Sequence, residues 1–254
     1  MVTAQADPAT AFLAVHIALA LQEAGPRRVL LLDLTVPGGA SLVFLDAEQS
    51  YHALDALGDV DRCDQTLIDT AFARFRDGLY LLCLPEECVA APAVEAEQLG
   101  RLLDGFTGFF DHVVVVADTG IGLTPLAAVC SRARKTLLLT DQSVLRSRRN
   151  KQLLHALRRC DCPLDSLGLV VDHGQAKAGM EAERLAGLLE VPLVGSLDGR
   201  LSVRVEAMNA GESLFDHAPR DGYCRDVLAL LDTLGSEAVA PGGRGGVMQR
   251  WFGT

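Results

Sequence analysis

The sequence predicts an α/β fold: a doubly wound, mostly parallel sheet of about seven strands with helices on both faces. Two observations support this. Six short runs are apolar at nearly every position, and helix-length segments follow most of them. Because runs without polar alternation suit strands covered on both faces, they indicate a parallel sheet. The alternation of strand and helix indicates the doubly wound class.

The predicted strands are, in chain order, "VLLLDL" (29–34), "LYLLCL" (79–84), "HVVVVAD" (112–118), "KTLLLTD" (135–141), "LGLVVD" (167–172) and "VPLVGSL" (191–197). The apolar start before Gln5 is barely long enough for a further strand. Helical patterns cover Phe12–Glu23, Ala93–Leu103, Val144–Arg159, Met180–Leu189 and Asp221–Leu234. Since ligands of such sheets bind beyond the carboxyl ends of the strands, we look for function there.

Composition favours one domain. The 254 residues are 49% hydrophobic and 22% charged, enough for one sizeable core, which we place at residues 1–235. The segment at 236–254 reads as a flexible linker and a short amphipathic tail. No apolar run approaches the ~20 residues that span a bilayer, and no leader pattern is present, so we expect a cytoplasmic protein that is at most peripheral at the inner face of the cytoplasmic membrane.

The net charge and the cysteine pattern argue against a generally nucleic-acid- or lipid-binding surface and against a metal or redox site. The net charge of -10 disfavours nonspecific binding of DNA or anionic lipid by the whole surface. The seven cysteines are scattered without a CxxC pair, so we expect buried thiols and no metal or redox site.

Four stretches in order carry a resemblance to a known family: "AVHIALALQEAG", "RVLLLDLTVPGG", "FDHVVVVADTG" and "VRVEAMNAGESLFDHAP". They resemble motifs of the deviant Walker-A ATPases of the MinD/ParA group. A fifth region, "LDAEQSYHALDAL" with "DQTLIDTAFARFRDGLYLLCLPEE", is similar to the CpaE/TadZ proteins of Flp (Tad) pilus assembly. The resemblance implies a P-loop NTPase-like fold. CpaE-type proteins often carry a receiver-like domain first, and we expect no room for one in this chain.

The family's phosphate loop, KGGxGKTT, falls on a stretch that has lost its chemistry. The aligned residues are Gln5, Ala6, Asp7, Pro8, Ala9, Thr10, Ala11 and Phe12. The loop normally binds phosphate through glycine N–H groups, a lysine and a hydroxyl on Mg²⁺. Three lost charge-assisted contacts cost about 5–9 kcal/mol, comparable to a whole micromolar affinity. We therefore expect no cofactor, and a plain strand-to-helix turn with Asp7 as N-cap and Pro8 at the first helical position.

The acidic positions that the resemblance implies are mixed. Asp33 matches the first aspartate of the second motif, but Thr35 stands at the second. Asp118 takes the Walker-B position, where it holds Mg²⁺ or caps the following turn; both interpretations stay open. Asp172 lies where relatives present an asparagine to adenine, and a carboxylate cannot donate the second hydrogen bond of that pair. His16 replaces the motif's asparagine and reads as a packing residue.

Two segments are candidate partner surfaces. The helix "SVLRSRRNKQLLHALRRC" carries Arg146, Arg148, Arg149 and Lys151, and ends on Arg158 and Arg159. We interpret it as a solvated amphipathic helix, with DNA or an acidic protein as alternatives. The tail places Val247, Met248, Arg250, Trp251 and Phe252 together, a minimal version of the MinD membrane helix; membrane contact, docking on a protein and disorder are the alternatives.

These observations together predict a degenerate, non-hydrolysing ATPase-like factor for localisation or assembly of a Flp/Tad-type pilus. The resemblance implies a homodimer across the former nucleotide face and contact with the pilus secretion ATPase or other assembly proteins. One alternative is a working ATPase that binds ATP and holds Mg²⁺ on Asp33 and Asp118. Another is a partitioning or positioning protein that binds DNA or membrane.

Overall fold

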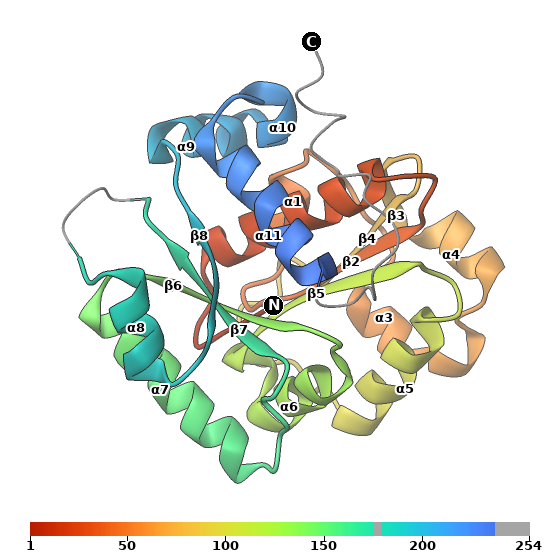
Figure 1. The fold of residues 1–254 in the computed structure, drawn as a ribbon. Coiled ribbons are helices and arrows are strands. Elements are labelled where there is room, and N and C mark those ends of the chain that lie inside the picture. Colours follow the sequence, from red (N-terminus) through yellow and green to blue (C-terminus); the bar gives the residue numbers. More distant parts are fainter. Residues whose placement is uncertain (175–178, 237–254) are drawn as a thin grey trace.

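The computed structural model describes residues 1–174 and 179–236, which build one eight-stranded sheet between two layers of helices (Figure 1). The strands are β1 (Val2–Thr3), β2 (Val29–Leu34), β3 (Ala73–Arg76), β4 (Leu79–Cys83), β5 (His112–Asp118), β6 (Thr136–Asp141), β7 (Leu167–Asp172) and β8 (Leu193–Leu197). Their order across the sheet is β3-β4-β2-β5-β1-β6-β7-β8. The β3–β4 pair is antiparallel and the other neighbours are parallel.

The predicted fold class is confirmed, with one strand more than expected. Each of the six predicted runs forms a strand, and the short apolar start pairs with both β5 and β6 at the centre of the sheet. The additional strand is β3, an edge strand that pairs with β4 through an irregular register. Its four residues are partly or fully exposed, so it lacks the continuous apolar run that marks the central strands.

The helices of the described residues are α1 (Pro8–Glu23), α2 (Ala40–Val43), α3 (Ala53–Gly58), α4 (Gln65–Ala71), α5 (Ala96–Phe106), α6 (Leu123–Arg132), α7 (Val144–Arg159), α8 (Ala182–Leu189), α9 (Leu201–Ala210), α10 (Leu214–His217) and α11 (Gly222–Ser236). Two 3-10 turns, η1 (Val60–Arg62) and η2 (Thr119–Ile121), complete them. The predicted helix at Val144–Arg159 has the observed bounds. The apolar pattern of the first helix starts at Phe12, whereas α1 begins at Pro8, the first helical position expected from the turn.

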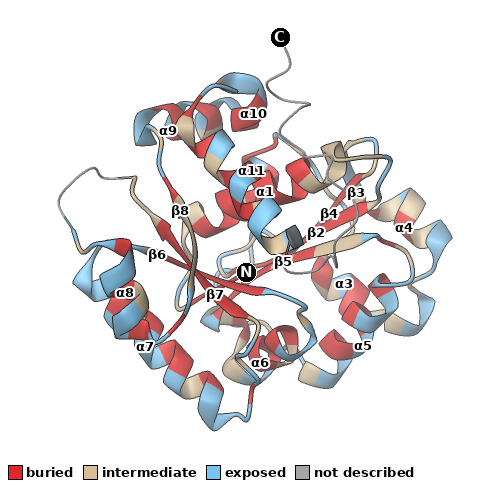
Figure 2. Ribbon diagram, viewed as in Figure 1, coloured by how far each residue is buried: buried red, intermediate tan, exposed pale blue. Residues whose placement is uncertain are grey.

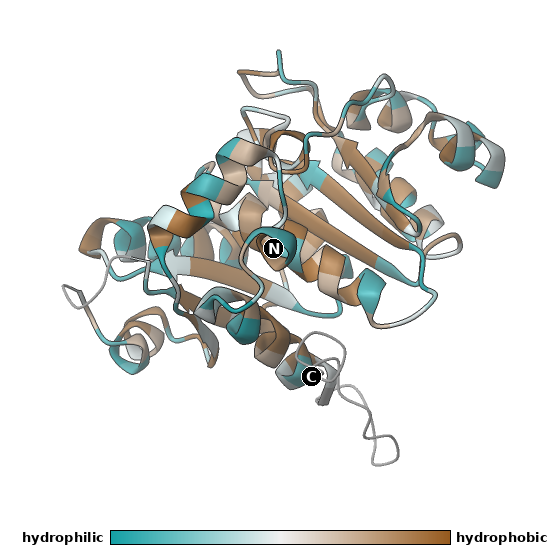
Figure 3. Ribbon diagram, turned by 90° about the horizontal axis from the view of Figure 1, so that it is seen from above, coloured by the Kyte–Doolittle hydropathy of each residue, from teal (hydrophilic) through white to brown (hydrophobic). Residues whose placement is uncertain are grey.

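Alternate strand residues feed two apolar clusters, one on each face of the sheet. One cluster joins the sheet to α3, α5, α6, α7 and α8, and the other joins it to α1, α2, α9, α10 and α11. Figure 2 shows the central strands buried between these layers, and Figure 3 shows their hydrophobic character against polar outer helix surfaces. Residues Thr10–Ala20 of α1 are all buried, since this helix is covered by β2, β5 and α11. The turn before α1 is therefore held in place by the core.

Candidate functional site

The predicted acidic residues meet at the carboxyl edge of the sheet. Asp33 and Asp118 belong to the ends of the neighbouring strands β2 and β5, and Asp7 follows β1, the next strand. Asp172 ends β7, two strands beyond β1, so it lies apart from that group. The topology thus gathers these candidates at one edge, and the partners of each carboxylate decide what the edge does.

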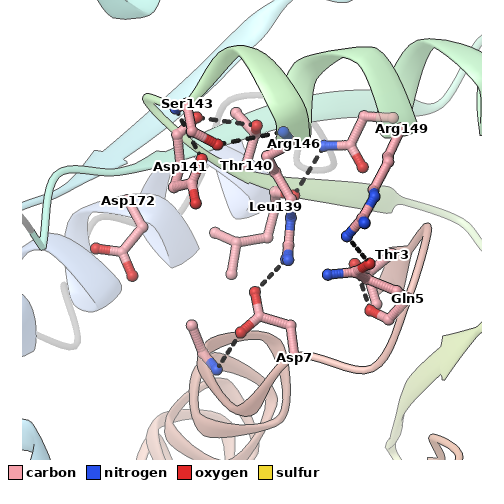
Figure 4. Close-up of polar contacts among 12 residues, drawn as sticks. Thr3, Gln5, Asp7, Leu139, Thr140, Asp141, Ser143, Arg146, Arg149 and Asp172 are labelled. Atoms are coloured by element: carbon pink, nitrogen blue, oxygen red, sulfur yellow. Dashed lines mark hydrogen bonds and ion pairs between the residues drawn. The ribbon is translucent and has the colours of Figure 1, made fainter. Parts of the chain in front are cut away.

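Asp7 ends the extended backbone before α1 and caps the helix. Its Oδ1 accepts a hydrogen bond from the Ala9 N–H at 3.0 Å, and Pro8 occupies the first helical turn, so the predicted N-cap is confirmed. The other carboxylate oxygen forms an ion pair with the guanidinium of Arg146 on α7 (Figure 4). The next turn of α7 supplies Arg149, which donates to the Oε1 of Gln5.

Three backbone N–H groups of this turn, those of Ala9, Thr10 and Ala11, donate within the turn itself. The Asp7 carbonyl accepts from the N–H groups of Thr10 at 2.9 Å and Ala11 at 3.4 Å, and Pro8 has no N–H. Phe12, at the hydroxyl position of the family loop, is fully buried and packs 4.1 Å from His16 between ring centroids. Ala6 and Ala9 have no side chain able to bind phosphate. The turn therefore does not fit a nucleotide phosphate.

Asp33 is fully buried and saturated with hydrogen bonds from its own loop. Its Oδ1 accepts from the N–H of Thr35 at 3.0 Å and from its hydroxyl at 2.6 Å. Its Oδ2 accepts from the N–H of Ser41 at 3.1 Å and from its hydroxyl at 2.6 Å. A carboxylate with four such partners shapes the β2–α2 loop and does not fit the role of a magnesium ligand.

Asp118 also serves the loops around it. It caps η2 by accepting from the Gly120 N–H, and its Oδ2 accepts from the Val36 N–H at 3.0 Å. Burial raises the pKa of this carboxyl, and the charge of nearby Asp33 adds to the rise. Of the two interpretations open from the sequence, the geometry shows the cap. Within the described residues, no group of three or more His, Cys, Asp or Glu side chains is arranged to hold a metal.

Asp172 is bound by an arginine that the sequence reasoning missed. Arg204 of α9 donates to Oδ2 at 2.7 Å and to Oδ1 at 3.0 Å, a two-point ion pair, and the Gly174 N–H adds a bond at 2.9 Å. Only 2% of Arg204 is exposed, and its guanidinium lies 4.8 Å from the centre of the Tyr223 ring. Its position between Val203 and Ala207, on the buried face of α9, was the available signal.

The basic helix α7 divides its charges between two roles. Arg146 and Arg149 face the β1–α1 turn, whereas Arg148 and Lys151 are exposed. No salt bridge to another described residue is present for Arg148, Lys151, Arg158 or Arg159. This exposed surface stays positively charged on an acidic protein.

A cavity of about 590 Å³ lies away from these residues, between the end of α2, β3 and the α9–α10 turn. Its lining includes Asp46, Glu48, Glu212 and Asp216 beside Arg74, and none of the predicted site residues. The tail residues Val247, Met248, Arg250, Trp251 and Phe252 fall outside the described residues. Across 1–174 and 179–236, no helix combines the length and apolar character needed to cross a bilayer.

No protein-family model matches the sequence, and no curated protein matches it significantly. Solved structures do. A ParA family ATPase from Chlorobium tepidum matches over 92% of this chain and 96% of its own, with a TM-score of 0.78 and 19% identity. MinD from Aquifex aeolicus matches over 96% and 98%, with a TM-score of 0.72 and 18% identity.

MinD from Pyrococcus horikoshii, solved in complex with Mg-ADP, matches over 93% of this chain and 95% of its own, with a TM-score of 0.70 and 16% identity. At such identities, likeness in structure establishes the fold and leaves the activity to the residues of each site. The chain therefore has the fold of these ParA and MinD proteins.

Proposed function

We propose that this protein is a localisation or assembly factor of the MinD/ParA type that acts through binding and does not hydrolyse ATP. The observation that carries the proposal is the Asp7–Arg146 ion pair at the first turn of α1. A negative charge stands where relatives of this fold would place a nucleotide phosphate. The hydrogen bonds of Asp33 support the same conclusion, because its four acceptor sites are all used within its own loop, and Asp118 is buried and bonded to the loops around it.

The finer part of the proposal rests on the sequence resemblance to CpaE/TadZ proteins. In a Flp/Tad-type pilus system, this chain would act at the inner face of the cytoplasmic membrane and contact the secretion ATPase or other assembly proteins. A structure of MinC with MinD from Aquifex aeolicus, with a TM-score of 0.73, gives a precedent for a partner protein bound to this fold. Residues 1–235 would form the binding domain, and 236–254 a linker and tail for weak membrane contact.

Titration calorimetry tests the proposal. Mg-ATP is titrated into the purified chain at concentrations that detect dissociation constants from about 0.1 to 500 μM, a range set by the affinity scale. We expect no binding heat and no magnesium-dependent phosphate release. Clear binding, with phosphate release abolished by Asp118→Ala, would instead establish the working ATPase. Tail-dependent contact with membrane is tested separately by liposome flotation of the full chain and of a chain lacking 247–254.

The exposed basic residues of α7 favour a second candidate, a positioning protein that binds DNA. Arg148 and Lys151 carry this candidate, because both are exposed and have no acidic partner in the described part of the chain. Fluorescence anisotropy with a labelled duplex would show salt-sensitive binding that Arg148→Glu and Lys151→Glu remove. Since the overall charge is -10, we expect the duplex to stay unbound at physiological salt. That result would favour the assembly factor over the DNA-binding protein.

A further inference from the structure

The first turn of α1 has the electrostatics of an anion site. The helix has 16 residues, so its N-terminus carries the partial positive charge of the aligned peptide dipoles. Arg146 points at this turn from α7 (Figure 4). Only 8% of Arg146 is exposed, and its Nε has no hydrogen-bond partner among the described residues. A buried guanidinium beside a helix N-terminus requires a negative charge between them.

The Asp7 carboxylate provides this charge in the way a bound oxyanion would. One oxygen accepts from the Ala9 N–H at 3.0 Å, and the other pairs with Arg146. A helix amide and a guanidinium acting together on two oxygens form a typical phosphate-binding arrangement. We propose that α1 and Arg146 form an oxyanion site for a phosphate group, and that the chain's own Asp7 occupies it.

This inference rests on the proposed loss of nucleotide binding and gives it a cause. In this interpretation, missing glycines are one reason why phosphate is excluded, and the occupied site is another. Asp7 is then an internal ligand that joins the β1–α1 turn to α7 without help from solution. The hydroxyl of Thr10, in the same helical turn, is also fully buried without a hydrogen-bond partner in the described chain.

An internal ligand and an ordinary ion pair differ in what remains when the carboxylate is removed. Removing one partner of a simple buried ion pair leaves the other charge unpaired and lowers the stability of the fold. Removing an internal ligand leaves a vacant site that accepts the same chemistry from solution. Asp7→Ala empties the site, and Asp7→Asn keeps a capping oxygen for Ala9 while removing the charge.

The experiment is thermal unfolding of both variants and the wild type with inorganic phosphate, against sodium chloride of equal ionic strength. Two charge-assisted contacts correspond to a dissociation constant of about 1 mM. At 20 mM phosphate, we expect the unfolding midpoint of Asp7→Ala to rise by about 4 °C relative to chloride. The wild type should not respond. If a variant folds poorly, the refolding yield with and without phosphate replaces the midpoint as the readout.

Double variants identify the cation that binds the phosphate. Asp7→Ala with Arg146→Met should lose the response to phosphate. Asp7→Ala with Arg148→Met should keep it, because Arg148 is an exposed arginine of the same helix that does not reach the turn. Equal phosphate and chloride curves for both Asp7 variants, or a response that survives Arg146→Met, would overturn the inference. Neither result touches the proposed function, which only wild-type binding of Mg-ATP would overturn.

Discussion

At the scale of single residues, a buried histidine joins the first helix to the C-terminal third of the chain. His16 Nδ1 lies 2.7 Å from the Phe12 carbonyl oxygen, and its Nε2 accepts the Leu214 N–H at 2.8 Å. These partners select the neutral ring with its proton on Nδ1. The packing role expected from the sequence is confirmed, together with a polar role that links α1 to α10.

The same histidine predicts a pH dependence of stability. Burial lowers the pKa of His16 to about 4, against 6.5 for the free side chain. Between those values the unfolded chain binds more protons than the folded one, so stability is full above pH 6.5 and falls as the pH decreases toward 4. We expect this group to contribute a loss on the order of 3 kcal/mol over that window.

Urea unfolding of the wild type and of His16→Gln at pH 4–7 measures this effect. Carboxyl groups titrate in both proteins, so the difference in slope between the two isolates the histidine. A variant with the same pH dependence as the wild type would show that His16 does not titrate in this range.

Asp172 and Arg204 are the second pair to probe at this scale. Since each is mostly buried against the other, Asp172→Asn or Arg204→Met leaves an unpaired polar group, at a cost of about 3–5 kcal/mol. The double variant Asp172→Asn/Arg204→Met should be more stable than the sum of the single losses predicts. Urea unfolding of the four proteins measures the coupling, and strictly additive losses would contradict it.

At the scale of elements, two glycines in or next to helices should respond to alanine in opposite directions. Gly211 ends α9 with a left-handed φ of 66°, and a Cβ there would lie 2.6 Å from the Cβ of Asp46. Gly187 lies within α8 with no atom near the position of an added Cβ. We expect Gly211→Ala to lower stability by about 1–3 kcal/mol and Gly187→Ala to raise it by about 0.5–1 kcal/mol.

Chemical denaturation of both glycine variants decides this prediction. The two substitutions add the same methyl group, so their difference reports the backbone and the space at each position. A loss at Gly187 equal to that at Gly211 would show that neither the left-handed backbone nor the close approach of Asp46 sets the cost at Gly211.

At the scale of the whole molecule, several exposed apolar side chains lie on segments that follow the carboxyl ends of strands. Val144 and Leu145 begin α7 after β6, and Leu201 and Val205 lie on α9 after β8. Val89 follows β4 in the same way. Exposed apolar side chains of this kind favour an interface, and the homodimer that the sequence resemblance implies would bury those of α7 and α9.

Sedimentation at micromolar concentration, with and without ATP, tests the dimer. We expect a dimer that is independent of ATP, and Leu145→Glu with Leu201→Glu should shift it to monomer. Leu188→Glu is the matched control, because this exposed leucine lies near the end of α8, just before β8 starts at the opposite edge. A monomer under all conditions would refute the dimer that the resemblance implies.

The sequence predicted the fold correctly where a short stretch of residues is enough to identify an element. β2, β5 and β7 have the predicted bounds, because a short run of continuous aliphatic residues in an α/β chain indicates a strand that is buried on both faces. β3 was missed because Ala73–Arg76 alternates arginines with small and aromatic residues at an edge. The shape of the turn before α1 was also readable, since Asp7 and Pro8 favour a capped helix start by their identity alone.

The partners of the buried charges were decided by the tertiary structure. Arg146 lies 139 residues from Asp7, and Arg204 lies 32 residues from Asp172, so no local pattern joins them. The sequence by itself determined the alternation of strands and helices, the side of the sheet on which the acidic residues gather, and the lack of glycine in the turn between β1 and α1. Only the folded chain selects which cation neutralises which carboxylate, because a charge removed from water must take the partner that packing brings within reach.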